Sequence, residues 1–139
     1  MHWESGYLLH IHIAPAASAN MVELDEAELV AGKGIVNDRY YKQNGSYSKI
    51  PDIRDVTLIE NEVLEALASN QPPLQEKPII LKPVEHRRNL TTSGVPLNYL
   101  VGKTFQIGEV ILKGGRLNFP CKYLADLLQK PLVLPLYNR

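Results

Sequence analysis

The sequence has few of the features that mark secreted, membrane or nucleic-acid-binding proteins. Its 139 residues include one cysteine, which cannot form an intramolecular disulfide and is typical of a reducing compartment. The 15 basic and 15 acidic side chains cancel, so we expect neither nucleic acid nor a membrane as a partner. No apolar run approaches the roughly 20 residues that span a bilayer, and the amino-terminal residues do not resemble a secretory signal. These absences predict a cytoplasmic protein.

What is present is the composition of a globular domain. Hydrophobic residues make up 45% of the chain and charged residues 22%, which argues against disorder. A chain of this length can bury roughly two-thirds of the surface that it exposes when unfolded, around one core. We therefore expect a single domain over residues 1–139.

The single cysteine is the first candidate for chemistry. Pro120 suits the first position of a helix, and apolar residues recur from Leu124 onward. Cys121 would then lie in the first helical turn, where the helix dipole and the neighbouring Lys122 lower the thiol pKa below about 8.5. The alternative is a small buried hydrophobic residue, which is the commoner fate of a lone cysteine.

Two histidines lie on the first predicted strand. Alternating apolar residues predict a strand over residues 7–13, which Pro15 ends. His10 and His12 share one face of it, at a spacing that can chelate a metal ion. Because no third ligand accompanies them, we favour the alternative of a polar strand face.

A glycine-containing loop is the next candidate. Two glycines flank Lys33 and let the backbone approach a ligand closely, and Asp38 beside Arg39 can fix the guanidinium or a turn. Just before this loop, a strand is predicted over residues 21–24, and a short helix is predicted from Asp25 and closed by Gly32.

The adjacent Arg87 and Arg88 form a third candidate. Neighbouring guanidinium groups repel one another unless solvent or an anion lies between them, and their forked donors suit phosphate or carboxylate. The alternative is a solvated basic turn.

The remaining segments predict further strands and one clear helix. Residues 56–59 predict a strand, followed by a helix over residues 60–69. Residues 79–81 suggest a short strand and residues 96–102 a single helical turn. Two alternating runs, residues 104–107 and 110–113, predict a hairpin.

Five segments, taken in their order along the chain, carry a family resemblance. They are Asn37-Asp38-Arg39-Tyr40, Val56-Thr57-Leu58-Ile59-Glu60, Arg87-Arg88-Asn89-Leu90, Leu97-Asn98-x-Leu100-Val101-Gly102-x-x-Phe105-x-Ile107-Gly108 and Pro120-Cys121-x-Tyr123-Leu124. Together they resemble the MOSC domain, which occurs at the carboxyl end of molybdenum-cofactor sulfurases, in mitochondrial amidoxime-reducing components and as small stand-alone bacterial proteins.

The resemblance implies a fold and a set of site residues. The fold is mainly β, a closed β-barrel of the pyruvate-kinase barrel type with a few short helices. Cys121 matches the cysteine proposed in the family to carry persulfide sulfur or to ligate molybdenum. The cofactor-binding residues that the resemblance implies are Asp38, Arg39, Arg87, Arg88, Asn89 and Lys122.

Two departures from the family pattern accompany the match. Asn37 stands where the family usually has glycine, which is tolerable at positive φ because asparagine visits that region more than most residues. A second cysteine that some family members carry near Cys121 is absent, so we expect no resolving thiol within the chain.

The function implied is a domain that handles sulfur or the molybdenum cofactor, either as a sulfur carrier or transferase or as a component of a molybdenum-dependent oxidoreductase. The implied cofactor is molybdopterin, and a pyridoxal-phosphate cysteine desulfurase, a molybdoenzyme or a reductase is the implied partner. The alternative is a non-catalytic module that binds an anionic small molecule or a partner protein.

The carboxyl end of the sequence departs from the family. A segment like Leu136-Tyr137-Asn138-Arg139 is usually followed there by further barrel strands, but this sequence ends at Arg139. We therefore expect a shortened domain whose open barrel edge is covered by a second copy, by a partner chain or by a rearranged terminal segment.

Overall fold

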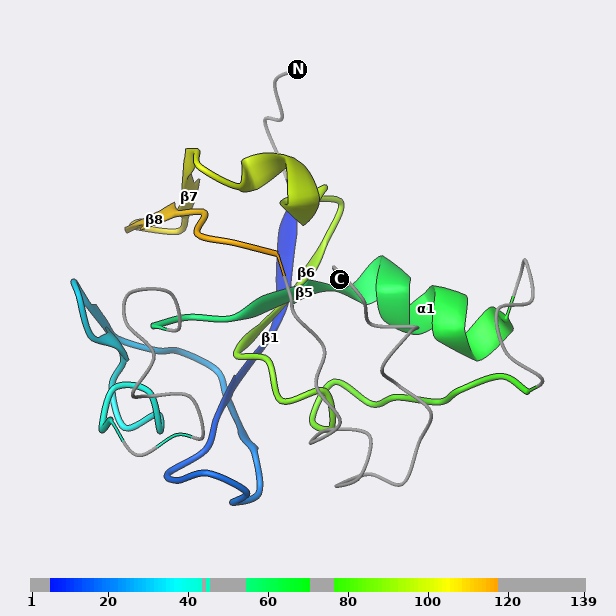
Figure 1. Ribbon diagram of the computed structural model, residues 1–139, viewed down its shortest axis with the longest axis horizontal. Coiled ribbons are helices and arrows are strands. Elements are labelled where there is room, and N and C mark those ends of the chain that lie inside the picture. The colour runs from blue at the N-terminus through cyan, green and yellow to red at the C-terminus, as the bar shows by residue number, and fades with distance from the viewer. Residues whose placement is uncertain (1–5, 44, 46–54, 71–76, 118–139) are drawn as a thin grey trace.

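The centre of the protein is a four-stranded sheet with the order β2-β1-β6-β5 (Figure 1). The computed structural model describes residues 6–43, 45, 55–70 and 77–117. Strand β1 (Tyr7–Ile13) pairs antiparallel with β2 (Val22–Leu24) and with β6 (Leu90–Ser93), and β6 pairs parallel with β5 (Leu58–Glu60). Strand β6 is therefore the link between the two ends of the sheet.

Strand β1 has the bounds that its alternating pattern predicts, but its polar face is not solvated throughout. The pairing with β6 shifts register between Leu8 and His10, and His12 is buried with 2% of its surface exposed. The ring of His12 lies edge-on to that of His86, with 6.3 Å between the ring centroids. The expected polar face thus becomes part of the interior at His12.

The helix α1 (Asn61–Ser69) follows β5 directly and covers the main apolar core. Its three core-facing residues are those the helical spacing predicts. The segment at residues 79–81 is not a strand, but its apolar side chains complete the same core. The core cluster consists of Ile59, Val63, Leu64, Leu67, Ile79 and Leu81.

Two small hairpins flank the sheet. The predicted short helix before Gly32 is wrong, because this segment forms β3 (Leu29–Val30), which pairs antiparallel with β4 (Gly34–Ile35). Gly34 has φ 107°, and a Cβ there would collide with the backbone of Asp55, so its closest neighbour is the chain itself. The predicted hairpin of β7 (Thr104–Ile107) and β8 (Val110–Lys113) is confirmed, as is the helical turn η1 (Leu97–Leu100) before it.

The expected closed β-barrel is wrong. A barrel needs every strand to have a partner on both sides, and among the described residues β2 and β5 do not pair with each other and both hairpins pair only internally. Most strands are only two to four residues long, too short to continue a ladder around a barrel. The expected dimer contact depended on the open edge of such a barrel, so this reason for expecting a dimer no longer holds.

The only α-helix among the described residues, α1, has nine residues. Within these ranges, no helix combines the length and the apolar character needed to cross a membrane.

Candidate functional site

Asp38 is buried at the start of a turn that follows the β3–β4 hairpin, with 0% of its surface exposed. Its Oδ1 accepts hydrogen bonds at 3.1 Å from the backbone N–H of Ala14 and from Nη1 of Arg39. Its Oδ2 accepts the backbone N–H of Tyr40 at 3.3 Å, which closes a local turn. Asn37, just before it, has φ 72°, the left-handed region in which asparagine is tolerated in place of glycine.

Arg39 directs its guanidinium inward rather than to solvent. It is 4% exposed, and its central carbon lies 4.5 Å from the ring centroid of Tyr40. Besides Asp38, Nη1 contacts Sδ of Met21 at 3.7 Å, and Nη2 donates to the backbone carbonyl of Arg87 at 2.8 Å. Arg39 thereby joins two of the motif segments, which are 48 positions apart in the sequence.

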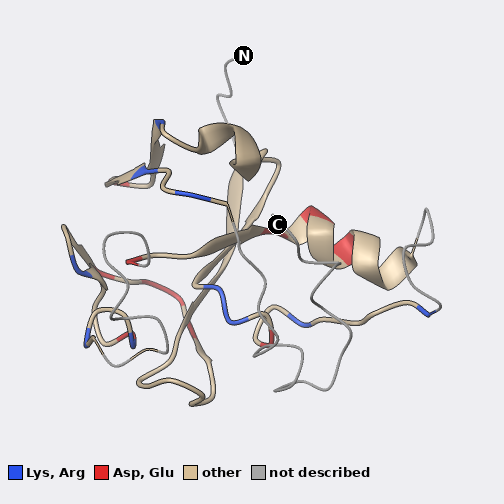
Figure 2. Ribbon diagram, viewed as in Figure 1, with Lys and Arg blue, Asp and Glu red and all other residues tan. Residues whose placement is uncertain are grey.

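Arg87 and Arg88 are half-buried in the turn that leads into β6. Lys and Arg are blue in Figure 2, and blue chain occurs in the segment between α1 and β6. Arg87 has φ 68°, an uncommon conformation for a residue with a long side chain. Its Nη1 donates to the carbonyl of Ala19, and Nη1 of Arg88 donates to the carbonyl of Leu58 at 3.2 Å. The alternative of a solvated basic turn does not hold, because the turn is packed and both guanidinium groups donate to backbone carbonyls.

Asn89 holds three strands together immediately before β6 begins. It is fully buried, and its Oδ1 accepts from the backbone N–H and from the hydroxyl of Thr57, both at 3.1 Å. Its Nδ2 donates to the carbonyl of His12 at 3.0 Å. Asn89 thus connects β1 to the residue before β5 across the end of β6, and its amide group is occupied by these contacts.

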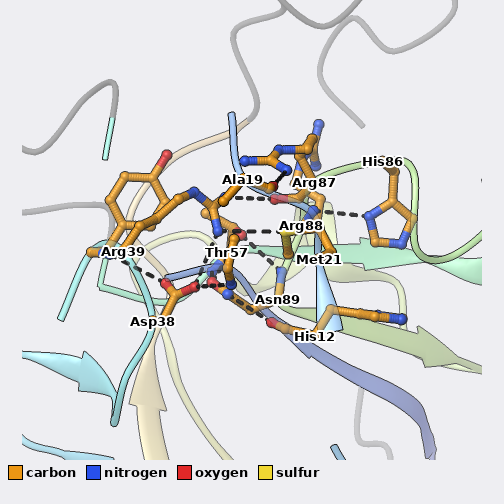
Figure 3. Close-up of polar contacts among 12 residues, drawn as sticks. His12, Ala19, Met21, Asp38, Arg39, Thr57, His86, Arg87, Arg88 and Asn89 are labelled. Atoms are coloured by element: carbon orange, nitrogen blue, oxygen red, sulfur yellow. Dashed lines mark hydrogen bonds and ion pairs between the residues drawn. The ribbon is translucent and has the colours of Figure 1, made fainter. Parts of the chain in front are cut away.

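These motif residues form one cluster, whose contacts are drawn in Figure 3. Asp38, Arg39, Arg87, Arg88 and Asn89, all candidates from the sequence, converge from the turn after β4 and the turn before β6. Among its described members, the cluster contains three guanidinium groups and one carboxylate, and that carboxylate pairs with Arg39. Guanidinium groups are the donors that suit phosphate or carboxylate.

His86 belongs to the same cluster, and sequence reasoning gave it no role. It is fully buried, with Nε2 2.9 Å from the hydroxyl of Thr91, and Nδ1 accepts the backbone N–H of Arg88 at 2.9 Å. Burial first, and then the nearby charges of Arg88, His12 and His10, lower the pKa of His86 to about 3. The only sequence signal was its place beside two arginines.

The histidines of β1 pair with an acidic residue of β2. Nδ1 of His10 lies 2.5 Å from Oε1 of Glu23, and Nε2 of His12 lies 3.4 Å from the same oxygen. Burial lowers the pKa of His12, which opposes the effect of Glu23. In the part of the chain that the structure describes, no group of three His, Cys, Asp or Glu residues is placed to hold a metal ion.

Two of the predicted site residues, Cys121 and Lys122, lie outside the described residues. A shallow depression of about 170 Å³ lies by β1 and β2, lined by His10, Glu23 and Asp25 together with apolar residues. That depression is separate from the arginine cluster, because the two share no residue.

Comparison with known proteins gives a likeness of fold. No family model matches the sequence, and no curated protein matches it. The YuaD protein from Bacillus subtilis is similar in structure, with a TM-score of 0.62 and 20% identity, over 90% of this chain and 74% of that one. A hypothetical protein of known crystal structure has the same TM-score of 0.62 with 16% identity, over 86% of this chain and 50% of that one.

These identities are low enough that the likeness concerns the fold alone. The chain spans about half the length of the hypothetical protein, at 50% coverage. The overlap with YuaD extends to 90% of this chain, so the likeness of fold covers most of the sequence.

Proposed function

We propose that this chain is a MOSC-type domain that handles sulfur or the molybdenum cofactor in the cytoplasm. In this proposal Cys121 carries persulfide sulfur or binds molybdenum, and the arginine cluster holds the phosphate of the cofactor. The observation that carries the proposal is the hydrogen bond from Arg39 to the carbonyl of Arg87 at 2.8 Å, because it unites two separate motif segments at one place.

The donor set fits a phosphate group when the arginines are assigned different tasks. Arg87 and Arg88 are half-buried, so each residue keeps some surface in contact with solvent, from which a phosphate can approach. Arg39 and Asp38 are buried and act by fixing the carbonyl of Arg87 and the turn around it. Guanidinium groups are donors only and match phosphate oxygens in geometry and charge.

Cys121 supplies the soft ligand that the proposal requires. A thiolate binds molybdenum, whose cofactor would supply redox chemistry when bound. For sulfur transfer, the Cys121 thiolate attacks the outer sulfur of a persulfide on a pyridoxal-phosphate cysteine desulfurase. The new sulfur–sulfur bond forms on Cys121 as the old one breaks, and the desulfurase cysteine leaves as a thiolate.

The decisive experiment measures what the protein carries when it is made in cells that synthesise molybdenum cofactor. We expect bound molybdenum by metal analysis, or a mass increase of one sulfur atom that a thiol reductant removes. Cys121→Ser should abolish either signal, and a double substitution of Arg87 and Arg88 to alanine should reduce molybdenum while leaving a persulfide in place. Wild-type protein with neither molybdenum nor added sulfur would contradict the proposal.

A second function has one observation in its favour. The buried members of the cluster direct their hydrogen bonds to the protein itself, as in the contacts of Asn89 to Thr57 and to the carbonyl of His12. Such a cluster also suits a non-catalytic module that binds an anionic small molecule or a partner protein. Anion binding that persists fully in Cys121→Ser, with no sulfur or molybdenum on the wild type, would favour this module.

A further inference from the structure

His86 uses both of its ring nitrogens inside the protein. Its Nδ1 accepts the backbone N–H of Arg88 at 2.9 Å (Figure 3). Its Nε2 lies 2.9 Å from the hydroxyl of Thr91 in β6. An acceptor at Nδ1 cannot carry a proton, so the hydrogen-bond network assigns the proton of the neutral ring to Nε2. The same ring therefore connects the turn of Arg87 and Arg88 to strand β6.

The residue between His86 and Arg88 is the one that needs support. Arg87 has φ 68°, a left-handed conformation that disfavours residues with a Cβ. The turn is held from two sides, because His86 binds the N–H after Arg87 and Arg39 binds its carbonyl at 2.8 Å. Backbone strain maintained in this way is found at ligand sites, where it presets a binding geometry.

We infer that His86 is a positioning residue, a neutral imidazole that holds the Arg87–Arg88 turn in its anion-binding conformation before the ligand arrives. This inference rests on the proposed anion site. A turn that is already ordered loses less conformational entropy when phosphate binds, so phosphate binds more tightly.

Neutrality of the ring is part of this role. A doubly protonated imidazole would offer a second donor where the Arg88 N–H needs an acceptor, and it would add positive charge beside the arginines. Among the described residues, the charged and titratable groups that act on the His86 ring are Arg88 on its own turn and His12 and His10 on β1. All three act with burial to lower its pKa to about 3.

The first test follows the Arg88 N–H by hydrogen exchange, with no ligand present. Asparagine at position 86 can place its amide oxygen close to the position of Nδ1, whereas glutamine reaches the position of Nε2 and leaves the Arg88 N–H without its acceptor. We expect His86→Asn to preserve protection and His86→Gln to exchange roughly tenfold faster, the factor expected for one lost hydrogen bond. Equal protection in both variants would overturn the inference.

The second test titrates inorganic phosphate and follows the Arg87 and Arg88 amide resonances. We expect His86→Asn to bind like the wild type and His86→Gln to bind roughly tenfold more weakly, in step with the lost hydrogen bond. If the Arg88 N–H of His86→Gln exchanges faster but the phosphate affinity is unchanged, the positioning role is overturned. No phosphate binding by the wild type would instead refute the anion site. The hydrogen-exchange experiment would then still test whether His86 holds the turn.

A third measurement needs no substitution and so remains informative if the variants do not fold. Nitrogen-15 spectra of the wild type should show His86 neutral at neutral pH, with its proton on Nε2. An imidazolium, or a proton on Nδ1, would overturn the inference directly.

Discussion

Acidification should destabilise this protein through His86 in a predictable way. In the folded chain the His86 pKa is lowered to about 3 from its ordinary 6.5, by burial first and then by Arg88, His12 and His10. Between these two pH values, the His86 imidazole is protonated in the unfolded chain and neutral in the folded chain. Stability therefore rises with pH through this window, and the contribution is fully present above 6.5 and is lost as the pH falls toward 3.

The size of the effect follows from linkage. One group that is protonated only in the unfolded state changes the free energy of unfolding by about 1.4 kcal/mol per pH unit. Lowering the pH to about 4.5, roughly two units below the unfolded value, should remove about 3 kcal/mol through His86 alone. Against a total of about 5–15 kcal/mol for a typical domain, that loss is easily measured.

The assay is urea unfolding followed by circular dichroism, at about pH 7 and again at about pH 4.5, on the wild type and on His86→Asn. Burial also lowers the pKa of His12, and carboxylates begin to titrate at the lower pH, so the wild type alone would mix several groups. The difference between the two proteins isolates His86. We expect the wild type to lose about 3 kcal/mol more than the variant, and equal losses would refute a neutral buried imidazole at this position.

Four further outcomes are expected. Asp38→Ala should lower the free energy of unfolding by about 3–5 kcal/mol in urea, because it leaves Arg39 charged and buried without its carboxylate, and Asp38→Asn should cost less. Asn89→Ala should cost about 2–3 kcal/mol in the same assay, since it leaves buried backbone groups without partners. Arg87→Gly should be more stable than Arg87→Ala by about 1 kcal/mol, because both lose the side chain but only glycine relaxes at positive φ. Alkylation of Cys121 by iodoacetamide should have its midpoint below about pH 8.5, and a midpoint at or above that value would contradict the thiolate.

Elements with a strong local pattern could be predicted from the sequence. The alternation in β1 and in the β7–β8 hairpin, and the helical spacing in α1, depend on neighbours within a few residues. The sequence also indicated that Asn37 could tolerate a positive φ, and its φ is 72°. In each case the deciding interaction lies within the segment itself.

The central strand could not be predicted in this way. Strand β6 has the sequence LTTS, which is short and polar, and it became buried because Asn89 fixes its start between β1 and the residue before β5. The closed barrel failed for a related reason, since the pairing of edge strands is set by contacts distant in sequence. The segment before Gly32 was misjudged because a helix cap and a strand end can carry the same residues.

The candidate site shows the same limit at the level of single side chains. Adjacent arginines in a sequence can bind an anion or lie in solvent, and local pattern does not decide between these outcomes. In the structure, two buried residues hold the turn of Arg87 and Arg88 in place. The guanidinium of Arg39 pairs with Asp38 and donates to the Arg87 carbonyl. The ring of His86 accepts the backbone N–H of Arg88. Because both supports are buried and neither can be replaced by solvent, the turn keeps its two half-buried cations in one arrangement. Under the proposed function, a phosphate would meet a turn that is already ordered, and its affinity should fall when either support is removed.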